Sequence, residues 1–500
     1  MRLLLASSEV HPYSKTGGLA DMAGALGKAL AQAGHRVGIV TPLYPGVRER
    51  FGELKLLDLR LDFPLGLARF RGEVWTLEPQ PGLTVYFIDQ PEFYQRSSLY
   101  QAHGLDYPDN AERFLFFSKA IARLALDLAW KPEMLHLNDW QTGFAALFIE
   151  HRRRQPEGGP GPGTCMTIHN LAYQGQFPPG QYALANLPWN YFTPQGVEFY
   201  GKVNCLKAGI AFADVITAVS PRYAREITTE EFGCGLDGLL RGRQDALLGI
   251  LNGVDYQEWN TTGDPFLPHP YSVNDLGGKA ADKLELQKEF GLPADAGVPL
   301  FGNIGRLVEQ KGVGIMLGAL EEMLSANLQF VLLGVGSPAF ERAYQDLARR
   351  FPARVAVRIG FDEGLSHRIE AGCDFFLMPS CFEPCGLNQM YGLRYGAIPI
   401  VRATGGLDDT VIDAREDAAR ADGIKFSEYS APALAKAIRK ALVLFQEPEA
   451  LAHFRANAMT VDFSWARTAD SYVAAYQRAM QQNTPEQRVN DHAAAGAHIS

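Results

Sequence analysis

The feature that most constrains the fold of this chain is an alternation of short apolar runs with amphipathic stretches. Residues 3–6 are apolar, the apolar positions between Leu19 and Ala33 are spaced by three and four, and residues 37–40 form another short apolar run. Short apolar runs are typical of buried strands, and the spacing of three and four is typical of a helix. The beginning of the chain therefore predicts a β-α-β unit.

The same alternation continues along most of the chain. The further predicted strands are residues 85–88, 134–137, 165–168, 215–219, 300–305, 330–334, 355–357, 375–378 and 398–401. Strands that alternate with helices predict an α/β fold with mostly parallel sheets, covered on both faces and binding ligands at the carboxyl ends of the strands. A polar, proline-containing stretch from 259 to about 275 interrupts the pattern, which favours two similar domains.

The predicted domains are residues 1–245 and 246–482. This partition suits a chain of 500 residues, for which two large domains or about three ordinary ones are expected. An amphipathic pattern predicts a final helix at about 463–480. Residues 483–500 lack a core-forming pattern and are predicted to be a disordered tail.

The charge balance and the cysteines exclude several classes of protein. The chain has 47 basic and 56 acidic residues, a net charge of −9, which argues against sequence-independent binding of nucleic acid. No apolar run reaches the roughly 18 residues of a membrane span, so no membrane association is expected. The six cysteines form no CxxC pair, and Cys381 and Cys385 have no third ligand nearby. We expect a cytoplasmic protein with reduced thiols.

A lysine and two glycines lie between the first predicted strand and the first predicted helix. Gly17 and Gly18 allow close approach to backbone amides, and a helix N-terminus favours negative charge, so Lys15 indicates a phosphate. The pattern matches neither the P-loop nor the dinucleotide fingerprint, which leaves a tight turn with a solvated lysine as the alternative. The pattern T-G-G-L-x-D of residues 16–21 recurs at residues 404–409, and each copy follows a predicted strand.

Two cations follow the first predicted strand of the second domain. Arg306 and Lys311 lie on a loop that leads into a helix, and a diphosphate suits an arginine fork combined with the point charge of a lysine. Taken alone, the pattern is equally typical of two exposed cations. Glu383 follows a later strand and is the candidate carboxylate for sugar hydroxyls or for charge in a transition state.

Polar residues also end two strands of the first domain. Asp139 follows the run 134–137 and His169 follows the run 165–168, so both are expected at the same sheet edge as Lys15. A single histidine at a strand end is more often structural, and only the combination favours a site. Aromatic residues such as Tyr100 suit sugar rings, although an ordinary core position explains each of them individually.

Together these motifs resemble the bacterial glycogen synthases and plant starch synthases. The shared stretches, between residue 8 and about residue 411, are SEVHPYSKTGGLADM, HLNDWQTG, TIHNLAYQG, ADVITAVSPRYAREI, GILNGVDYQEW, IGRLVEQKG, PSCFEPCGLNQMYGLRYG and ATGGLDDTV. The resemblance implies a GT-B architecture, in which two Rossmann-like domains face each other across a deep interdomain cleft and the final helix crosses back to the first domain. It also implies retaining, metal-independent transfer of glucose from ADP-glucose to the non-reducing end of an α-1,4-glucan, either glycogen or a malto-oligosaccharide.

The resemblance also assigns roles to matching residues. It implies that Arg306 and Lys311 hold the donor diphosphate, which Lys15 approaches from the first domain. The implied catalytic residues are Lys15, His169, Arg306, Lys311 and Glu383. The implied donor-binding residues are Gly17, Gly18, Asn252, Thr404, Gly405 and Gly406, and the implied acceptor-side residues are Asp139 and Tyr100. No metal, cofactor or enzyme nucleophile is implied.

The chain departs from the family pattern at a few positions. Cys381 stands where arginine is common, and Asn260–Thr261 follows Trp259 where proline is usual. Tyr391 replaces the second glutamate of the wider E-x7-E pattern, which agrees with the glycogen and starch synthase branch. These departures leave the implied cations and Glu383 in place.

Two other classes of function compete with this interpretation. A glucan-binding scaffold without catalysis should have lost at least one of the five implied catalytic residues, and all five are present. An NAD-dependent oxidoreductase should carry G-x-G-x-x-G after an early strand, whereas Gly334 and Gly336 lack the third glycine. The sequence does not decide whether the donor is ADP-glucose or UDP-glucose, and it predicts no oligomeric state.

Overall fold

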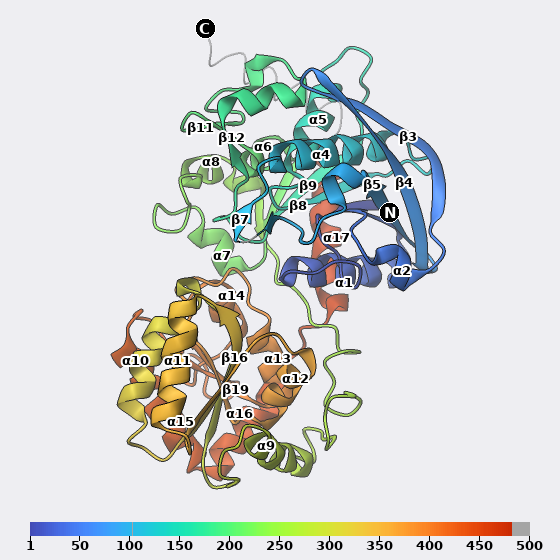
Figure 1. Cartoon of the computed structure of the whole chain (residues 1–500). Coiled ribbons are helices and arrows are strands. Elements are labelled where there is room, and N and C mark those ends of the chain that lie inside the picture. The colour runs from blue at the N-terminus through green and yellow to red at the C-terminus, as the bar shows by residue number, and fades with distance from the viewer. Residues whose placement is uncertain (103, 483–500) are drawn as a thin grey trace. The chain divides into compact units, whose positions relative to one another are not determined.

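The computed structural model describes residues 1–102 and 104–482, and Figure 1 shows the elements in chain order. These residues form two compact units. Unit 1 comprises Met1–Val219, Ala224–Gly253 and helix α17 (Trp465–Gln482), and unit 2 comprises Ser220–Tyr223 and Val254–Ser464. Each unit contains one large sheet covered by helices, as the alternation of strands and helices predicts.

The large sheet of unit 1 has nine strands in the order β14-β13-β9-β8-β1-β2-β5-β4-β3. The parallel strands are β1 (Arg2–Ala6), β2 (Arg36–Pro42), β5 (Leu83–Asp89), β8 (Met134–Asn138), β9 (Gly163–Ile168), β13 (Val215–Ala218) and β14 (Leu247–Gly249). The sequence pattern did not predict β3 (Lys55–Leu65) and β4 (Ala68–Gln80), which extend the sheet as an antiparallel ribbon. Their residues alternate between partly buried and exposed, so they lack the apolar runs of strands buried on both faces.

Helices and short strands complete unit 1. The α-helices besides α17 are α1 (Gly18–Gln32), α2 (Val47–Phe51), α3 (Pro91–Tyr94), α4 (Asn110–Asp127), α5 (Gly143–Arg153), α6 (Cys205–Phe212), α7 (Pro221–Glu226) and α8 (Asp237–Gly242), of which α7 begins within unit 2. The 3-10 helices are η1 (Pro179–Ala185), η2 (Trp189–Tyr191) and η3 (Gln244–Ala246). The short strands are β6 (Gln101–Ala102), β7 (Leu105–Asp106), β10 (Gln176–Phe177), β11 (Glu198–Phe199) and β12 (Lys202–Asn204).

The sheet of unit 2 has six parallel strands in the order β17-β16-β15-β18-β19-β20. They are β15 (Leu300–Leu307), β16 (Gln329–Gly336), β17 (Val355–Ile359), β18 (Phe375–Met378), β19 (Ile398–Arg402) and β20 (Ile424–Phe426). Successive side chains of a strand point to opposite faces, and here Phe330 and Leu332 enter one core cluster while Val331 and Leu333 enter another. Both faces of the sheet are therefore buried.

The helices of unit 2 cover these two faces. They are α9 (Gly277–Glu289), η4 (Glu309–Lys311), α10 (Val313–Met323), α11 (Pro338–Arg350), α12 (Glu363–Gly372), α13 (Asn388–Tyr395), α14 (Gly405–Thr410), α15 (Ala431–Phe445) and α16 (Pro448–Thr460). Residues of α10, α11 and α15 pack in the cluster with Phe330, and residues of α9 and α12 pack in the cluster with Val331. The unit is a three-layer α/β/α arrangement.

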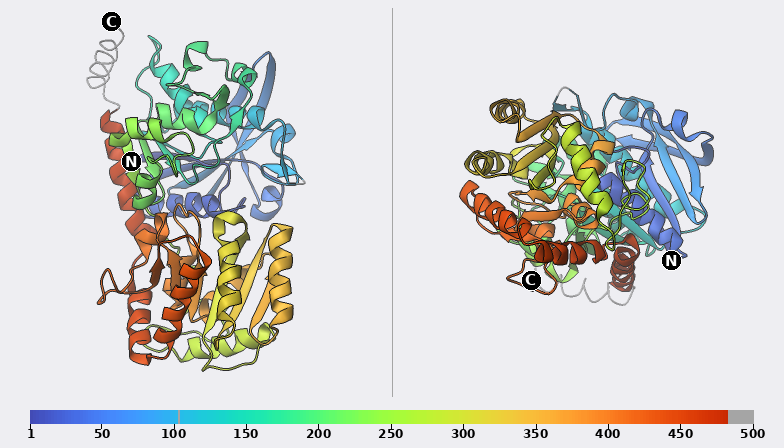
Figure 2. Two further views of the ribbon diagram at one scale, coloured as in Figure 1. Left: turned by 90° about the vertical axis from the view of Figure 1, so that its left-hand side faces the viewer. Right: turned by 90° about the horizontal axis from the view of Figure 1, so that it is seen from below.

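Helix α17 is the last described helix and lies in unit 1, where it packs on α1, β9 and β13 (Figure 2). Its residues Tyr472 and Tyr476 are fully buried in the same core cluster as β1 and β2. The boundary predicted between residues 245 and 246 is wrong by eight residues, because β14 pairs with β13 and the division falls between Gly253 and Val254. Residues 483–500, predicted to be a tail, lie outside the described part of the chain.

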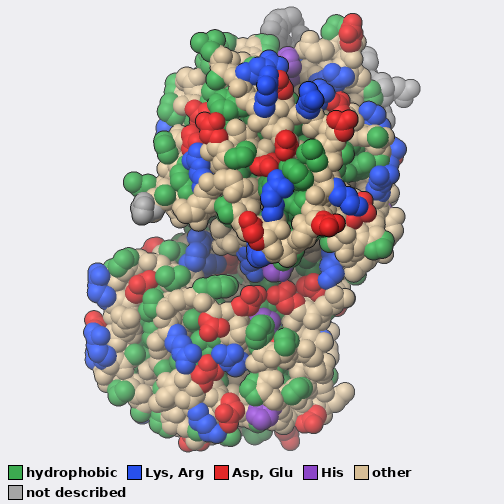
Figure 3. All heavy atoms as spheres, turned by 45° about the vertical axis from the view of Figure 1, so that its right-hand side comes forward, with side chains coloured by type: hydrophobic (Ala, Val, Ile, Leu, Met, Phe, Trp, Pro, Cys, Tyr) green, Lys and Arg blue, Asp and Glu red, His purple; other side chains and the backbone are tan. Residues whose placement is uncertain are grey.

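Two surface properties bear on the expected partners. Within residues 1–102 and 104–482, no helix combines the length and the apolar character needed to cross a membrane. Figure 3 shows one face, on which lysine and arginine side chains are mixed with aspartate and glutamate side chains. That face offers no extended basic field of the kind that binds a nucleic-acid backbone.

Candidate active site

The loop of Lys15 joins β1 to α1 in unit 1. Helix α1 begins at Gly18, and Gly17 precedes it in an extended conformation. A Cβ atom built on Gly17 would meet nothing within 4 Å, so this backbone is open on the side where a side chain would stand. Lys15 Nζ lies 2.8 Å from Asp21 Oδ1 in the first turn of the helix, and both side chains are partly exposed. The loop combines an open backbone with a cation, which suits an anionic ligand.

Glu9 holds this loop, and the sequence analysis assigned it no role. Thr16 donates both its backbone N–H and its hydroxyl to the Glu9 carboxylate, and Tyr100 donates its hydroxyl to Glu9 Oε1 at 3.1 Å. Ser8 Oγ lies 2.7 Å from the Tyr100 hydroxyl. Burial raises the pKa of Glu9, while the hydrogen bonds from Thr16 and Tyr100 oppose this rise. Tyr100, predicted on the acceptor side, is therefore tied to the support of the Lys15 loop.

The structure brings Asp139 and His169 together at the carboxyl ends of β8 and β9. The His169 backbone N–H donates to Asp139 Oδ1 at 2.8 Å, and His169 Nε2 lies 3.0 Å from Asn138 Oδ1. Asn138 in turn donates its amide to the Ala6 carbonyl at the end of β1. Because the Asn138 side-chain nitrogen donates to Ala6, its Oδ1 accepts from His169 Nε2–H. Nδ1 of His169 is then the acceptor nitrogen of the ring.

Burial keeps this edge of unit 1 largely uncharged. It lowers the pKa of His169 to about 3, so the ring is neutral at physiological pH. Burial also raises the pKa of Asp139 to about 7, against the opposing hydrogen bonds from the backbone of His169 and Asn170. A neutral imidazole and a half-ionised carboxyl are suited to hydrogen bonds with hydroxyl groups.

Asn252 and His136 show the two possible outcomes for a buried polar side chain. Asn252 follows β14, is buried, and its Oδ1 has no hydrogen-bond partner among the described residues. An unpaired buried acceptor is costly unless a ligand donates to it. By contrast, His136 uses both ring nitrogens within unit 1, near Thr167 Oγ1 at 2.6 Å and the Tyr476 hydroxyl at 2.8 Å, and is structural.

In unit 2 the structure joins Lys311 and Glu383, which are 72 residues apart in the sequence. Lys311 Nζ lies 2.5 Å from Glu383 Oε2, and Ser380 Oγ donates to the same oxygen at 3.0 Å. The Glu383 side chain is 7% exposed and that of Lys311 is 25% exposed, so the pair is partly desolvated but open at the lysine end. Such a pair places one positive and one negative group side by side at the strand ends of the sheet.

Two close backbone approaches fix the loops around this pair. A Cβ on Gly312, which has a φ of +69°, would lie 2.0 Å from the Pro379 carbonyl oxygen, so only glycine fits between the Lys311 turn and the 379–383 loop. A Cβ on Gly406 would lie 2.0 Å from the Cys385 carbonyl oxygen. The Gly406 N–H donates to the Glu383 carbonyl at 3.0 Å, which holds the turn of residues 404–406 against Glu383.

Two arginines lie at the carboxyl ends of strands in unit 2. Arg306 is exposed near the end of β15, and within the described residues it makes no ion pair. Arg402 ends β19 and donates to the carbonyls of Ser380 and Cys381, so it braces the loop that carries Glu383. No local motif in the sequence points to Arg402, because it supports a loop that lies 21 and 22 residues earlier in the chain.

Comparisons with known proteins agree with this geometry. The family model of the starch synthase catalytic domain matches residues 2–242, and that of the group 1 glycosyl transferases matches residues 285–459. A curated glycogen synthase from Anaeromyxobacter sp. (strain Fw109-5) is 48% identical over 95% of this chain and 99% of that protein. The chain belongs to the glycogen and starch synthase family. It is a glycosyltransferase.

Other members of the glycogen and starch synthase family give the same result. A glycogen synthase from Myxococcus xanthus (strain DK1622) is 47% identical over 95% of this chain and 99% of that protein. The catalytic domain of starch synthase IV from Arabidopsis thaliana, solved with ADP and acarbose, has a TM-score of 0.87 and 34% identity, covering 96% of this chain and 99% of that one. A sucrose-phosphate synthase from Thermosynechococcus elongatus, at 19% identity and a TM-score of 0.59, shares the fold. The chain has the GT-B fold.

Proposed function

We propose that this glycosyltransferase transfers glucose from ADP-glucose to the non-reducing end of an α-1,4-glucan, with retention of configuration at the anomeric carbon. The observation that carries the proposal is the Lys311–Glu383 pair, because a nucleotide sugar presents a diphosphate and a neutral sugar ring next to each other. A lysine suits the first and a carboxylate suits the hydroxyls of the second. Family membership supports a glucan acceptor, either glycogen or a malto-oligosaccharide.

In unit 2, Arg306 and Lys311 would bind the diphosphate oxygens. Arg306 is exposed and supplies a fork of N–H donors, while Lys311 is held in place through Glu383 and the Gly312 turn. When the bond from the sugar to the diphosphate breaks, negative charge grows on the departing ADP. Preorganised cations stabilise that charge without rearrangement, and this is commonly a large contribution to the rate.

The sugar would be oriented by the Glu383 carboxylate and by neutral groups. Glu383 would accept from glucose hydroxyls with the backbone amides of Thr404, Gly405 and Gly406 nearby, while Asn252 and His169 of unit 1 would bind the same ring. Asn252 Oδ1 is suited to this role since it has no hydrogen-bond partner among residues 1–102 and 104–482. Lys15, beside Gly17 and Gly18, would approach the diphosphate, and Asp139 and Tyr100 would lie on the acceptor side.

We further propose that this transfer needs no metal ion and no cofactor, and that the enzyme acts in the cytoplasm. Three lysine and arginine side chains take over the charge stabilisation that a divalent cation supplies in other phosphate-transferring sites. No side chain is assigned as a nucleophile. A departing phosphate oxygen would instead help remove the proton of the acceptor hydroxyl on the face that the leaving group vacates.

A donor competition assay tests the proposal. The full chain is incubated with glycogen and equal concentrations of ADP-glucose and UDP-glucose, each labelled differently in the glucose, with and without EDTA. We expect incorporation mainly from ADP-glucose, unchanged by EDTA. Incorporation mainly from UDP-glucose would correct the donor, loss of incorporation with EDTA would correct the metal independence, and no incorporation from either donor would favour the glucan-binding scaffold.

A further inference from the structure

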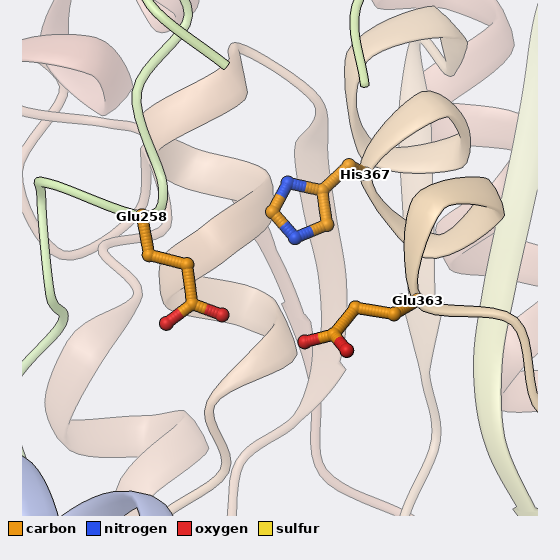
Figure 4. Close-up of side chains that lie close together, drawn as sticks. All are labelled: Glu258, Glu363 and His367. Atoms are coloured by element: carbon orange, nitrogen blue, oxygen red, sulfur yellow. The ribbon is translucent and has the colours of Figure 1, made fainter. Parts of the chain in front are cut away.

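A histidine and two glutamates converge in unit 2, and the transfer reaction proposed above uses none of them. They are Glu258, Glu363 and His367, and one potential ligand atom from each lies within 4.8 Å of the others (Figure 4). Glu363 and His367 are four residues apart on α12 and so share one face of that helix. Glu258 comes from the segment that follows the boundary between the units. Two separate segments of unit 2 thus place metal-binding groups at one point.

His367 is the residue that points to a ligand. Its side chain is only 1% exposed, and its Nε2 atom has no hydrogen-bond partner among the described residues. Figure 4 shows that this nitrogen faces the space between the two glutamate carboxylates. A buried ring nitrogen without a partner is rare, and it indicates a bound water, an ion or another ligand.

Asp264 determines which nitrogen of His367 is available. Asp264 Oδ2 lies 2.6 Å from His367 Nδ1 and also accepts a hydrogen bond from the Tyr395 hydroxyl at 2.5 Å. The Asp264 carboxylate accepts from Nδ1–H, which leaves a lone pair on Nε2. Histidines that bind metals commonly have this carboxylate partner on the opposite nitrogen.

Aromatic packing holds the ring of His367 in this orientation. Trp259 stacks on it with centroids 3.9 Å apart and an interplanar angle of 12°, and Phe266 lies against it at 5.1 Å. The same Trp259 ring stacks on Tyr391 at 3.6 Å. A ligand nitrogen that is fixed by stacking and by Asp264 needs no reorganisation when an ion binds.

We propose that Glu258, Glu363 and His367 form a zinc site. One imidazole nitrogen and two carboxylate oxygens match the ligands that zinc accepts, with a fourth position left for water, whereas magnesium and calcium prefer oxygen ligands alone. A tetrahedral zinc shell has ligand atoms roughly 3.4 Å apart. The present spread of 4.8 Å closes through side-chain rotation of the two glutamates, because Glu363 is exposed and Glu258 is half-buried.

The ion would link two segments of unit 2. It would join the segment of Glu258 to α12, and through Trp259 and Tyr391 it would steady α13, which follows the loop of Glu383. The site contains none of the residues assigned to the donor diphosphate. Its effect is therefore on the stability of unit 2, and the proposal stands independently of the donor and acceptor.

Zinc titration of the metal-free full chain tests the proposal. Zinc alone is added in competition with a chromophoric chelator to the parent protein, to Glu363→Gln and to Glu449→Gln, a control in the first turn of α16 that is equally exposed. We expect the parent and the control to bind one equivalent more than Glu363→Gln, or to bind it at least tenfold more tightly, since changes around ligands alone cost about 10- to 100-fold. Zinc bound elsewhere on the chain is common to all three proteins and cancels in the comparison.

Two further measurements complete the test. Zinc should raise the thermal midpoint of the parent and of Glu449→Gln, but not of Glu363→Gln. Cobalt should give the visible absorption of a tetrahedral site in the parent and lose it in Glu258→Gln. Equal zinc binding by the parent and Glu363→Gln, or no zinc binding by either, overturns the proposal; His367 then pairs with the glutamates directly. Because Glu363 is exposed, its variant folds even where a His367 variant does not.

Discussion

The candidate site residues of the two units differ in charge. In unit 2, Lys311 and Glu383 form an ion pair that stays open at the lysine end. In unit 1, burial lowers the pKa of His169 to about 3 and raises that of Asp139 to about 7, so the corresponding strand ends carry little charge. Lys311 of unit 2 is therefore suited to a charged diphosphate, and the ends of β8 and β9 in unit 1 are suited to neutral hydroxyls. Each prediction below separates these two contributions.

The largest effect is expected from the ion pair. Lys311→Ala and Glu383→Ala should each lower the turnover number with ADP-glucose and glycogen by about 10²- to 10³-fold, because a lost preorganised contact costs about 3 to 4 kcal/mol in the barrier. Lys440→Ala, an exposed position on α15, should change turnover by less than about twofold. Incorporation of labelled glucose into glycogen measures the rates, and circular dichroism checks folding. Turnover within about threefold of the parent in both variants would remove the pair from the site.

A double variant sharpens this result. If Lys311 and Glu383 act as one unit, Lys311→Ala combined with Glu383→Ala should cost about as much as either change alone. Residues that act together are strongly non-additive, whereas independent contacts add in free energy. Additive losses would mean that the ion pair seen in the structure is broken when the donor binds.

The second effect tests whether unit 1 contributes a cation. Lys15→Ala should lower kcat/KM for ADP-glucose by about 10- to 100-fold, since a charged hydrogen bond contributes about 1.5 to 3 kcal/mol. Asp21→Asn removes the carboxylate that pairs with Lys15 at 2.8 Å and should change kcat/KM by less than about threefold. Both variants are compared with the parent at low and high salt, because salt weakens a contact between Lys15 and a diphosphate, so the loss caused by Lys15→Ala should shrink as the salt concentration rises. Equal losses in both variants would assign Lys15 to the support of α1.

The third prediction concerns pH and the carboxyl of Asp139. Its pKa is raised in the folded state to about 7 from an ordinary value of 3.8, so the folded protein binds a proton that the unfolded chain has released. The contribution of Asp139 to the free energy of unfolding therefore falls as the pH rises between these two values. From pH 5 to pH 7 the loss is about 2 kcal/mol.

The thermal midpoint measures this loss. Between pH 5 and pH 7 the midpoint of Asp139→Asn should fall less, or rise more, than that of the parent, while Asp106→Asn, at an exposed position of β7, should follow the parent. The test depends on the sign of the difference between Asp139→Asn and the parent in how the midpoint changes with pH. A decrease that is steeper in Asp139→Asn than in the parent would show that Asp139 is ionised in the folded state well below neutral pH.

The sequence predicted those parts of the fold that have a local signature. Strands buried on both faces, such as β1 and β16, appear as apolar runs, and both copies of T-G-G-L-x-D open helices, α1 and α14. The ribbon β3–β4 was missed because its side chains are half-exposed and its pairing is set by β5. The domain boundary was misplaced since the strand that decides it, β14, has only three residues.

The sequence likewise predicted only part of the candidate site. The glycine loops and the cations were found because they follow strands, and the ends of parallel strands gather at one edge. The residues that hold them were not found. Glu9 reaches Thr16, and Arg402 reaches the loop of Glu383, through hydrogen bonds that depend on tertiary packing and have no fixed spacing in the sequence. A resemblance can name a ligand-binding side chain, but only the structure shows what positions it.

The smallest effect is expected at Asn252, where stability and activity should respond in different directions. Its buried Oδ1 has no partner within the described part of the chain, so Asn252→Ala removes an unsatisfied acceptor and should leave the thermal midpoint unchanged or slightly higher. The same change removes a hydrogen bond to the donor sugar and should lower turnover about 5- to 15-fold, or about 1 to 1.5 kcal/mol. Asn457 is the matched control, because its amide is satisfied by the carbonyls of Ala419 and Ala421. Asn457→Ala should lower the midpoint and leave turnover intact. If Asn252→Ala lowers the midpoint as Asn457→Ala does and turnover stays the same, Asn252 supports the fold and the neutral contribution of unit 1 rests on His169 alone.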